Sequence, residues 1–161
     1  MSNNRSSILE VYKKVNKSGD LEKSPYEIVK LVLNELSRAM EMLSKDIDKK
    51  NNAILAKKNK EIIYIQKSIS KTVTRSLTTI YSLQTSLDFE KGGEIATNLF
   101  NLYEFCRLEI IKGFSQSLNI GIKRAKYALD QIIEAWNEMI LMSVKKWIKI
   151  LIKMKESHWI N

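Results

Sequence analysis

Proline and glycine are scarce in this chain, with one proline and five glycines among 161 residues. A sheet protein needs a turn every few residues, and turns depend largely on these two residue types. The apolar residues instead recur at the three- and four-residue steps that are typical of helices. We therefore predict an all-α protein: an antiparallel bundle of four to five helices, with a flexible N-terminal arm and an extended C-terminal helix.

Cysteine and histidine occur once each, as Cys106 and His158. A single cysteine cannot form an internal disulfide, which fits a reducing compartment. The sequence also lacks a phosphate-binding glycine spacing, a zinc spacing and a nucleophile elbow, and a single histidine and a single cysteine exclude most nucleophile–base arrangements. We therefore expect no enzyme activity, no cofactor and no metal site.

Long charge-free stretches are also missing. A membrane-spanning helix needs about 20 apolar residues, and no early segment resembles a secretory leader, so we expect a cytosolic protein. The formal net charge of +9 raises the question of a polyanionic partner. The lysines are spread over the whole chain without a recognised binding motif, and no nucleic-acid partner is expected.

At this length the chain is expected to form one domain. Its first 23 residues are polar and basic and contain too few apolar side chains to fold alone. We predict an arm over 1–23 and a single helical-bundle domain over 24–161. The apolar residues of the arm form one small cluster: Ile8, Leu9, Val11, Tyr12 and Val15.

The first long helix has a clear start at Ser24-Pro25-Tyr26-Glu27. Serine caps the free amides, proline occupies the first helical position, and glutamate completes a capping box. We predict a helix end and a connection within the polar stretch 44–60, and then a second apolar row from Ile62 to Leu87. Part of this row is rich in Ser and Thr, which are weak helix formers. We expect tertiary packing to hold it and allow for a break near 66–70.

The stretch Leu87–Phe105, LDFEKGGEIATNLFNLYEF, organises the rest of the chain. Gly92-Gly93 gives the backbone the φ > 0 freedom that a reversal needs, and Glu94 places negative charge at the start of the next helix. The pattern predicts two antiparallel helices joined by a tight glycine turn. The second of these helices has a broad apolar face, which comprises Ile95, Ala96, Leu99, Leu102, Tyr103 and Phe105.

Two more boundaries follow from the pattern. The helix that begins at Glu94 is predicted to reach about Leu118, because the Asn-Ile-Gly sequence at 119–121 tolerates the left-handed conformation that ends helices. A last helix then passes Trp136 and continues into the tail 137–161.

The motif in Leu87–Tyr103 resembles the signature of the flagellar secretion chaperone family FliS, Leu-Asp-x-Glu-x-Gly-Gly-Glu-Ile-Ala-x-Asn-Leu-x-x-Leu-Tyr. The matching positions are Leu87, Asp88, Glu90, Gly92, Gly93, Glu94, Ile95, Ala96, Asn98, Leu99, Leu102 and Tyr103. Ser24-Pro25 also matches the start of the first long helix in the family, and Trp136 matches a tryptophan near the end of many members. Tyr12 matches a tyrosine in an arm that, by the resemblance, covers part of a client groove.

This resemblance implies an export chaperone of the flagellar type III secretion system. Such a protein is expected to bind the disordered C-terminal segment of flagellin in apolar grooves between helices and so to prevent premature polymerisation in the cytosol. Further partners implied are the cytoplasmic domain of the export gate and other flagellar assembly regulators. The resemblance assigns client-binding or groove-shaping roles to Tyr12, Ser24, Pro25, Leu87, Asp88, Glu90, Gly92, Gly93, Ile95, Ala96, Leu99, Leu102 and Tyr103.

The chain departs from the family in three places. Leu33-Asn34-Glu35 stands where the family often has an aromatic-Asp-Gly triplet, and the region before the motif is longer, which is expected to extend a helical hairpin away from the body. The tail 137–161 is a basic amphipathic helix, which we interpret as packing on that hairpin. The alternative is binding to a membrane surface. The residues for membrane or partner contact are Lys145, Lys146, Trp147, Lys149 and Lys153.

Overall fold

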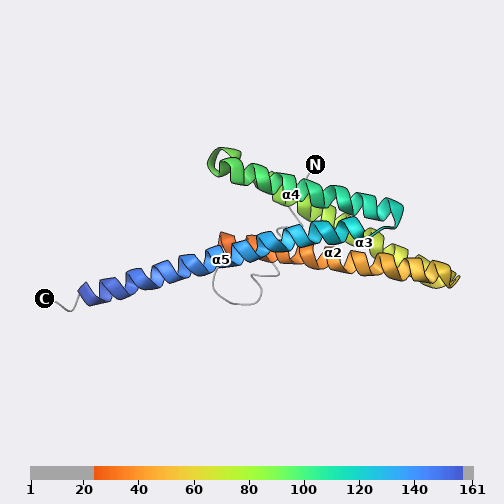
Figure 1. Ribbon diagram of the computed structural model, residues 1–161, viewed down its shortest axis with the longest axis horizontal. Coiled ribbons are helices and arrows are strands. Elements are labelled where there is room, and N and C mark those ends of the chain that lie inside the picture. Colours follow the sequence, from red (N-terminus) through yellow and green to blue (C-terminus); the bar gives the residue numbers. More distant parts are fainter. Residues whose placement is uncertain (1–23, 158–161) are drawn as a thin grey trace, which may run out of the picture.

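The computed structural model describes residues 24–157, except for the side chains of 147 and 150–157. These residues form four helices: α2 (Pro25–Leu55), α3 (Asn59–Thr85), α4 (Phe89–Gln116) and α5 (Ile120–Ser157). Successive helices run antiparallel, which confirms the predicted all-α bundle (Figure 1). The predicted arm 1–23, with Tyr12, lies outside the described residues, as does His158.

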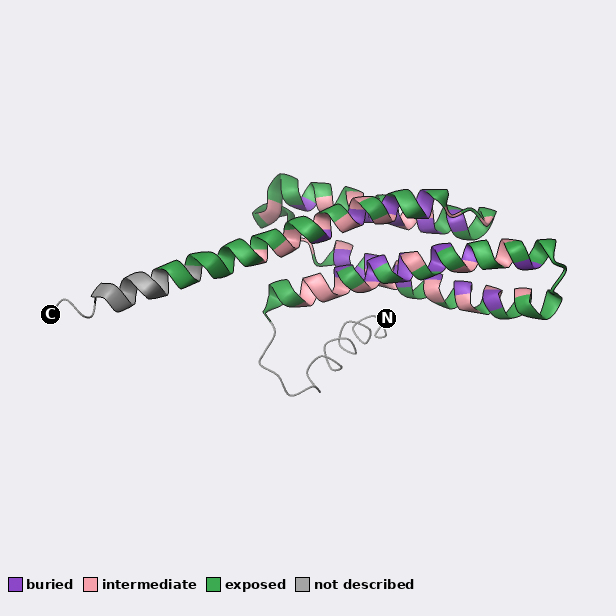
Figure 2. Cartoon of the chain, turned by 60° about the horizontal axis from the view of Figure 1, so that its bottom comes forward, coloured by how far each residue is buried: buried purple, intermediate pink, exposed green. Residues whose placement is uncertain are grey.

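The helices are arranged in cyclic order around one apolar core. α2 and α4 lie diagonally opposite, and each packs against both α3 and α5. Figure 2 shows the buried positions on the inward faces of the helices. The core takes residues from every helix: Leu33, Leu36, Met40, Leu43 and Ile47 from α2, Ile65, Ile69, Val73 and Ile80 from α3, Tyr103, Cys106 and Ile110 from α4, and Ile122, Ala125 and Leu129 from α5.

The start of α2 has the predicted capping box. The Glu27 backbone N–H donates to Ser24 Oγ at 3.3 Å, and the Ser24 backbone N–H donates to Glu27 Oε2 at 2.9 Å. The structure confirms a helix end and a connection within the polar stretch 44–60, since α2 ends at Leu55 and α3 begins at Asn59. Ala53 is buried there and holds the last turn against the core.

α3 is continuous, so the break that we allowed for near 66–70 is absent from it. Several of its threonine hydroxyl groups find partners within the helix instead of competing with it. Thr74 Oγ1 donates to the Ser70 carbonyl at 3.0 Å, and Thr78 Oγ1 donates to the Thr74 carbonyl at 2.9 Å. The buried row that includes Ile69 and Val73 supplies the tertiary packing that we expected to hold this stretch.

The turn between α4 and α5 differs from the predicted helix stop at 119–121. α4 ends at Gln116, and Ser117 takes the left-handed conformation with φ 52° and ψ 41°. Gly121 lies inside α5, against the Glu109 side chain. The turn is held by α2, since Asn51 Nδ2 donates to the Ser117 carbonyl at 3.0 Å. This long-range hydrogen bond is invisible in the local sequence.

The ends of the bundle are uneven. Figures 1 and 2 show the tip of the α2–α3 hairpin reaching beyond the α4–α5 turn, as the surplus length predicts. α5 leaves the bundle at the opposite end and continues alone, with Leu141, Met142 and Val144 exposed. The prediction that the tail packs on the hairpin is therefore wrong, because the direction of α5 carries the tail away from it.

We predict that Ser76→Ala raises the free energy of unfolding by about 1 kcal/mol. Ser76 is buried on α3, and within residues 24–157 no partner lies within hydrogen-bonding distance of its hydroxyl. A buried hydroxyl without a partner is destabilising, and alanine is also the better helix former. Urea unfolding followed by circular dichroism measures the change. A loss of stability in this variant would show that the hydroxyl has a partner in solution.

Candidate functional site

The motif in Leu87–Tyr103 begins with a helix cap. Asp88 Oδ1 accepts a hydrogen bond from the Lys91 backbone N–H at 3.0 Å, and the Asp88 carbonyl accepts one from the Gly92 N–H at 2.8 Å. α3 ends at Thr85 and α4 begins at Phe89. The reversal between the two helices therefore lies at 86–88, and the predicted turn at the glycine pair is wrong, because the cap starts a helical turn before the glycines.

Gly93 nevertheless redirects the chain. Its backbone has φ 50° and ψ −126°, which breaks α4 into a short hook, Phe89–Gly92, and the main helix. The hook appears as a tight curl at the start of α4 in Figure 1. The Phe89 ring meets the Phe100 ring edge to face, with centroids 6.0 Å apart, so the hook folds back onto the main helix.

The motif residues divide into buried and exposed groups. Tyr103 is only 2% exposed and Ala96 is buried, whereas Leu87, Leu99 and Leu102 are partly buried and pack against the core. These residues shape the bundle. The motif residues left on the surface are Asp88, Glu90, Gly93, Glu94, Ile95 and Asn98.

Tyr103 and Cys106 are both buried on the side of α4 that packs against the core. Burial, with a contribution from Cys106, raises the pKa of Tyr103 to about 12, and burial raises the pKa of the Cys106 thiol to about 12. The thiol lies 3.8 Å from the Ala125 carbonyl of α5. It therefore stays protonated at neutral pH and acts as a packing group, since the thiolate is the reactive form.

The main helix of α4 also has large apolar side chains on its outer flanks. We name these residues the α4 surface, and each is between 37% and 72% exposed: Ile95, Phe100, Phe105, Leu108, Ile111 and Phe114. Of these six residues, the sequence analysis assigned a site role only to Ile95. It placed Phe105 on the apolar face of the helix without a site role, and it missed Phe100, Leu108, Ile111 and Phe114 as site residues. The available signal was that α4 has more apolar residues than one buried face of a helix can hold.

The charge on α4 is partly neutralised close to this surface. Arg107 Nε donates to Glu104 Oε2 at 2.9 Å, and Gln84 Nε2 of α3 donates to the same oxygen at 3.1 Å. The hydrogen bond from Arg107, followed by that from Gln84, lowers the pKa of Glu104 to about 2. The carboxylate therefore stays ionised at neutral pH and remains paired with Arg107.

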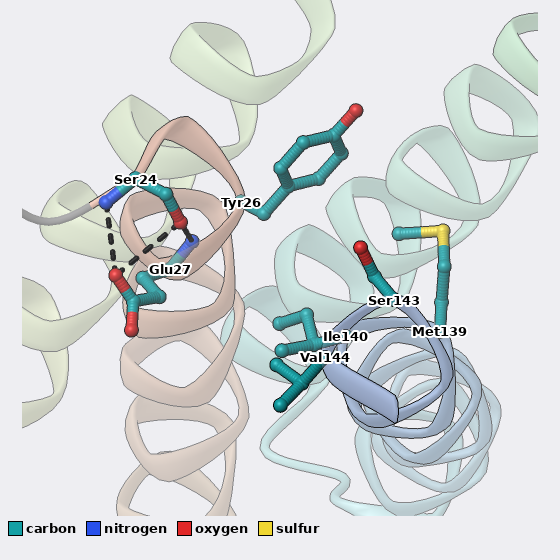
Figure 3. Close-up of a pocket in the computed structure, with 7 residues that line it drawn as sticks. All are labelled: Ser24, Tyr26, Glu27, Met139, Ile140, Ser143 and Val144. Carbon is teal, nitrogen blue, oxygen red and sulfur yellow. Dashed lines mark hydrogen bonds between the residues drawn. The ribbon is translucent and has the colours of Figure 1, made fainter. Parts of the chain in front are cut away.

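A pocket of about 430 Å³ lies between the start of α2 and the middle of α5. Trp136 Nε1 donates to the Tyr26 carbonyl at 3.0 Å and their rings lie 6.1 Å apart, so these residues join the two helices there. Pro25 is exposed at this end of the bundle. Figure 3 shows the lining residues: Ser24, Tyr26, Glu27, Met139, Ile140, Ser143 and Val144.

The other predicted site residues lie apart from these features. Lys145, Lys146 and Lys149 are exposed on the free part of α5, whereas the side chains of Trp147 and Lys153 lie outside the described residues. In the part of the chain that the structure describes, no cluster of His, Cys, Asp and Glu suits a metal ion. None of the described helices is both long and apolar enough to cross a membrane.

Comparison with known proteins agrees with this geometry. The family model for the flagellar protein FliS matches residues 9–143. The flagellar secretion chaperone FliS of Salmonella typhimurium is 37% identical over 57 residues, which are 35% of this chain and 42% of that protein. That alignment therefore spans less than half of the relative. Because the family model covers most of this four-helix chain and its motif, the chain belongs to the FliS family of flagellar proteins.

Proposed function

We propose that this protein is an export chaperone that binds the disordered C-terminal segment of flagellin and delivers it to the flagellar type III export apparatus. The observation that carries the proposal is the α4 surface, where large apolar side chains stay exposed on the helix of the family motif. Exposed apolar patches of this kind mark interaction sites. An amphipathic client segment can lay its apolar face into the grooves beside such a helix.

The energetics of this role favour a long apolar surface. Ordering a disordered segment costs about 2–5 kcal/mol of the gross interaction. At ~25 cal/mol per Å² of buried apolar area, about 200 Å² offsets even the larger figure. The six residues of the α4 surface, spread along nearly the whole of α4, offer exposed apolar area for such a contact.

The motif residues act mainly by shaping this surface. Ala96 and Tyr103 are buried, and Leu99 and Leu102 pack against the core beneath the exposed side chains. Residues 1–23 are proposed as an arm that covers part of the client groove through Tyr12, beside a bundle domain over 24–161. We further propose that the protein acts in the cytosol. Its other proposed partners are the cytoplasmic domain of the export gate and other flagellar assembly regulators. Family membership also agrees with the prediction of a non-enzymatic protein.

Titration calorimetry with a peptide covering the C-terminal helical segment of flagellin from the same organism tests the proposal. We expect one-to-one binding with a negative heat-capacity change, as for apolar burial. Leu108→Glu should weaken binding about fivefold, because it places a charge in the centre of the α4 surface. Leu108 is exposed, so the fold should be unaffected.

The matched control is Ile63→Glu, an equally drastic change at an exposed position on α3 near the hairpin tip. It should leave the affinity unchanged. Equal losses in the two variants would remove the α4 surface from the proposal. Absence of binding both with and without residues 1–23 would refute the chaperone function itself.

A further inference from the structure

The fold gathers basic residues from distant parts of the sequence at one end of the bundle. Residues 49–60 cross the α2–α3 turn and include five lysines and no acidic residue. The next residue, Glu61, is paired with Lys58 at 3.3 Å. Residues 110–129 cross the α4–α5 turn at the same end and include four basic residues and no acidic one. Toward the other end, residues 130–138 of α5 include three acidic residues and no basic one.

The α2–α3 turn at this basic end also presents large apolar side chains to solvent. We name these residues the tip patch, and each is between 48% and 82% exposed: Ile54, Leu55, Ile63 and Tyr64. The turn between them is tight, because Lys57 takes the left-handed conformation with φ 54° and the Lys58 N–H donates to the Ala53 carbonyl at 3.0 Å. The tip patch therefore lies beyond the α4–α5 turn, where the hairpin protrudes (Figures 1 and 2).

Lysines lie on the same sides of α3 as the apolar residues of the tip patch. Lys60 precedes Ile63 by three residues and Tyr64 by four, and Lys67 follows them by four and three. Residues at these steps are neighbours on a helix surface. Both lysines are exposed, and within residues 24–157 neither is paired with a carboxylate. A surface that receives the apolar side chains therefore meets these ammonium groups as well, and negative charge on that surface is favoured.

The directions of the apolar side chains favour a lipid surface over a protein groove. Neighbouring residues of an α-helix point about 100° apart, so Ile54 and Leu55 point to different sides of α2. Ile63 and Tyr64 likewise point to different sides of α3. A groove or a partner helix covers one side of such a tip. The interface of a bilayer surrounds the whole tip, accommodates tyrosine and apolar side chains, and attracts lysines where its lipids are anionic.

We propose that the tip patch inserts into the surface of a membrane that contains anionic lipids. Leu55 and Tyr64 enter between the headgroups, and Lys57, Lys60 and Lys67 lie among the headgroup phosphates. The bundle then stands on its basic end, with the acidic part of α5 directed away from the membrane. This contact does not rest on the proposed flagellin binding, because none of its residues belongs to the α4 surface. It is also separate from the tail of α5, which leaves the bundle at the opposite end (Figure 1).

Co-sedimentation of the full chain with lipid vesicles tests this proposal. We expect binding to vesicles of mixed phosphatidylglycerol and phosphatidylcholine, weakening as salt is added, and little binding to phosphatidylcholine alone. The triple change Lys57→Gln, Lys60→Gln and Lys67→Gln should weaken binding about tenfold or more, since each lysine close to an anionic surface contributes about fivefold. The matched control removes the same charge from the tail through Lys145→Gln, Lys146→Gln and Lys149→Gln, and it should leave most of the binding intact.

An apolar variant tests insertion separately from charge. The double change Leu55→Ser and Tyr64→Ser should weaken vesicle binding about tenfold, because it removes apolar area that enters the interface. Its control is Tyr127→Ser with Leu141→Ser, which truncates two exposed side chains elsewhere on the bundle and should change little. Both tip variants should keep the affinity for the flagellin peptide, and Leu108→Glu should keep vesicle binding, so the two proposals can fail independently.

Several results would overturn the proposal. One is absence of binding to the anionic vesicles, and another is binding that the tail variant removes and the tip variants leave unchanged. Binding of a glutamate-rich peptide at the tip without vesicle binding would mean that the patch receives an acidic protein. Sedimentation velocity covers self-association, because the basic end of one copy could meet the acidic part of another. An oligomer that the triple change at Lys57, Lys60 and Lys67 dissociates, without vesicle binding, would likewise refute membrane insertion.

Discussion

Leu129→Ala should lower the free energy of unfolding by about 3–4 kcal/mol, the largest loss that we expect from a single truncation in this bundle. Leu129 is 0% exposed and lies on α5 among core residues from the other helices. The truncation removes apolar contacts and leaves a cavity, and α5 cannot close that cavity because it packs against α2 and α4 at once. Urea unfolding followed by circular dichroism, with an unchanged m-value, measures the loss.

Tyr127→Ala is the control, since Tyr127 lies two residues away on the same helix and is largely exposed. It should change stability by no more than about 0.5 kcal/mol. Nearly equal losses for the two variants would contradict the burial of α5 described above. A small loss for both would mean that the bundle relaxes around the cavity.

Periodicity predicted the core well because burial in a helical bundle follows one stripe per helix. The row predicted between Ile62 and Leu87 contains Ile69, Val73 and Ile80, and the structure buries all three. Capping was predictable for a related reason. The Ser24–Glu27 box and its proline act within one turn, so their effect depends on local sequence alone.

The end of α2 could be predicted only as lying within the polar stretch 44–60, and the structure places it at Leu55. α2 runs on to Leu55 because Ala53 is buried in the hairpin, and that contact comes from another helix. The glycine pair shows a second source of error. Gly93 does take a backbone conformation that suits glycine, but the Asp88 cap had already started the helix. The Asp88 cap and the glycine pair are both local signals for a helix boundary. Only the structure shows that the helix begins at the cap and that the glycine then kinks it.

The candidate site was predictable only in part. The motif located α4, but its spacing could not separate Tyr103, which is buried, from Phe105, which belongs to the exposed α4 surface. Both fall on the broad apolar face of one helix, and the neighbouring helices decide which side is covered. The course of the tail was unpredictable for the same reason. A stripe of Ile and Val requires a partner, and the sequence does not say whether that partner belongs to the same chain.

Gly93→Ala should lower the free energy of unfolding by about 2 kcal/mol. At φ 50° and ψ −126° a side chain is strained, and the ψ angle also lies outside the left-handed helical region that other residues reach. No atom lies within 4 Å of the position that a Cβ would occupy. The loss therefore comes from the backbone conformation alone. Asn98→Ala, at an exposed position one turn further along α4, is the control and should be nearly neutral.

Hydrogen exchange distinguishes two ways in which the Gly93 variant can respond. If the strain is confined to the hook, amides of Phe89–Gly92 exchange faster while the core keeps its protection, and the measured loss is limited to what the Asp88 cap and the Phe89–Phe100 contact contribute. If the strain spreads, core amides on α3 and α4 exchange faster as well. An unchanged stability together with unchanged exchange would mean that Gly93 does not hold the strained conformation in solution. The kink would then have no role in positioning Ile95 and Phe100 on the α4 surface.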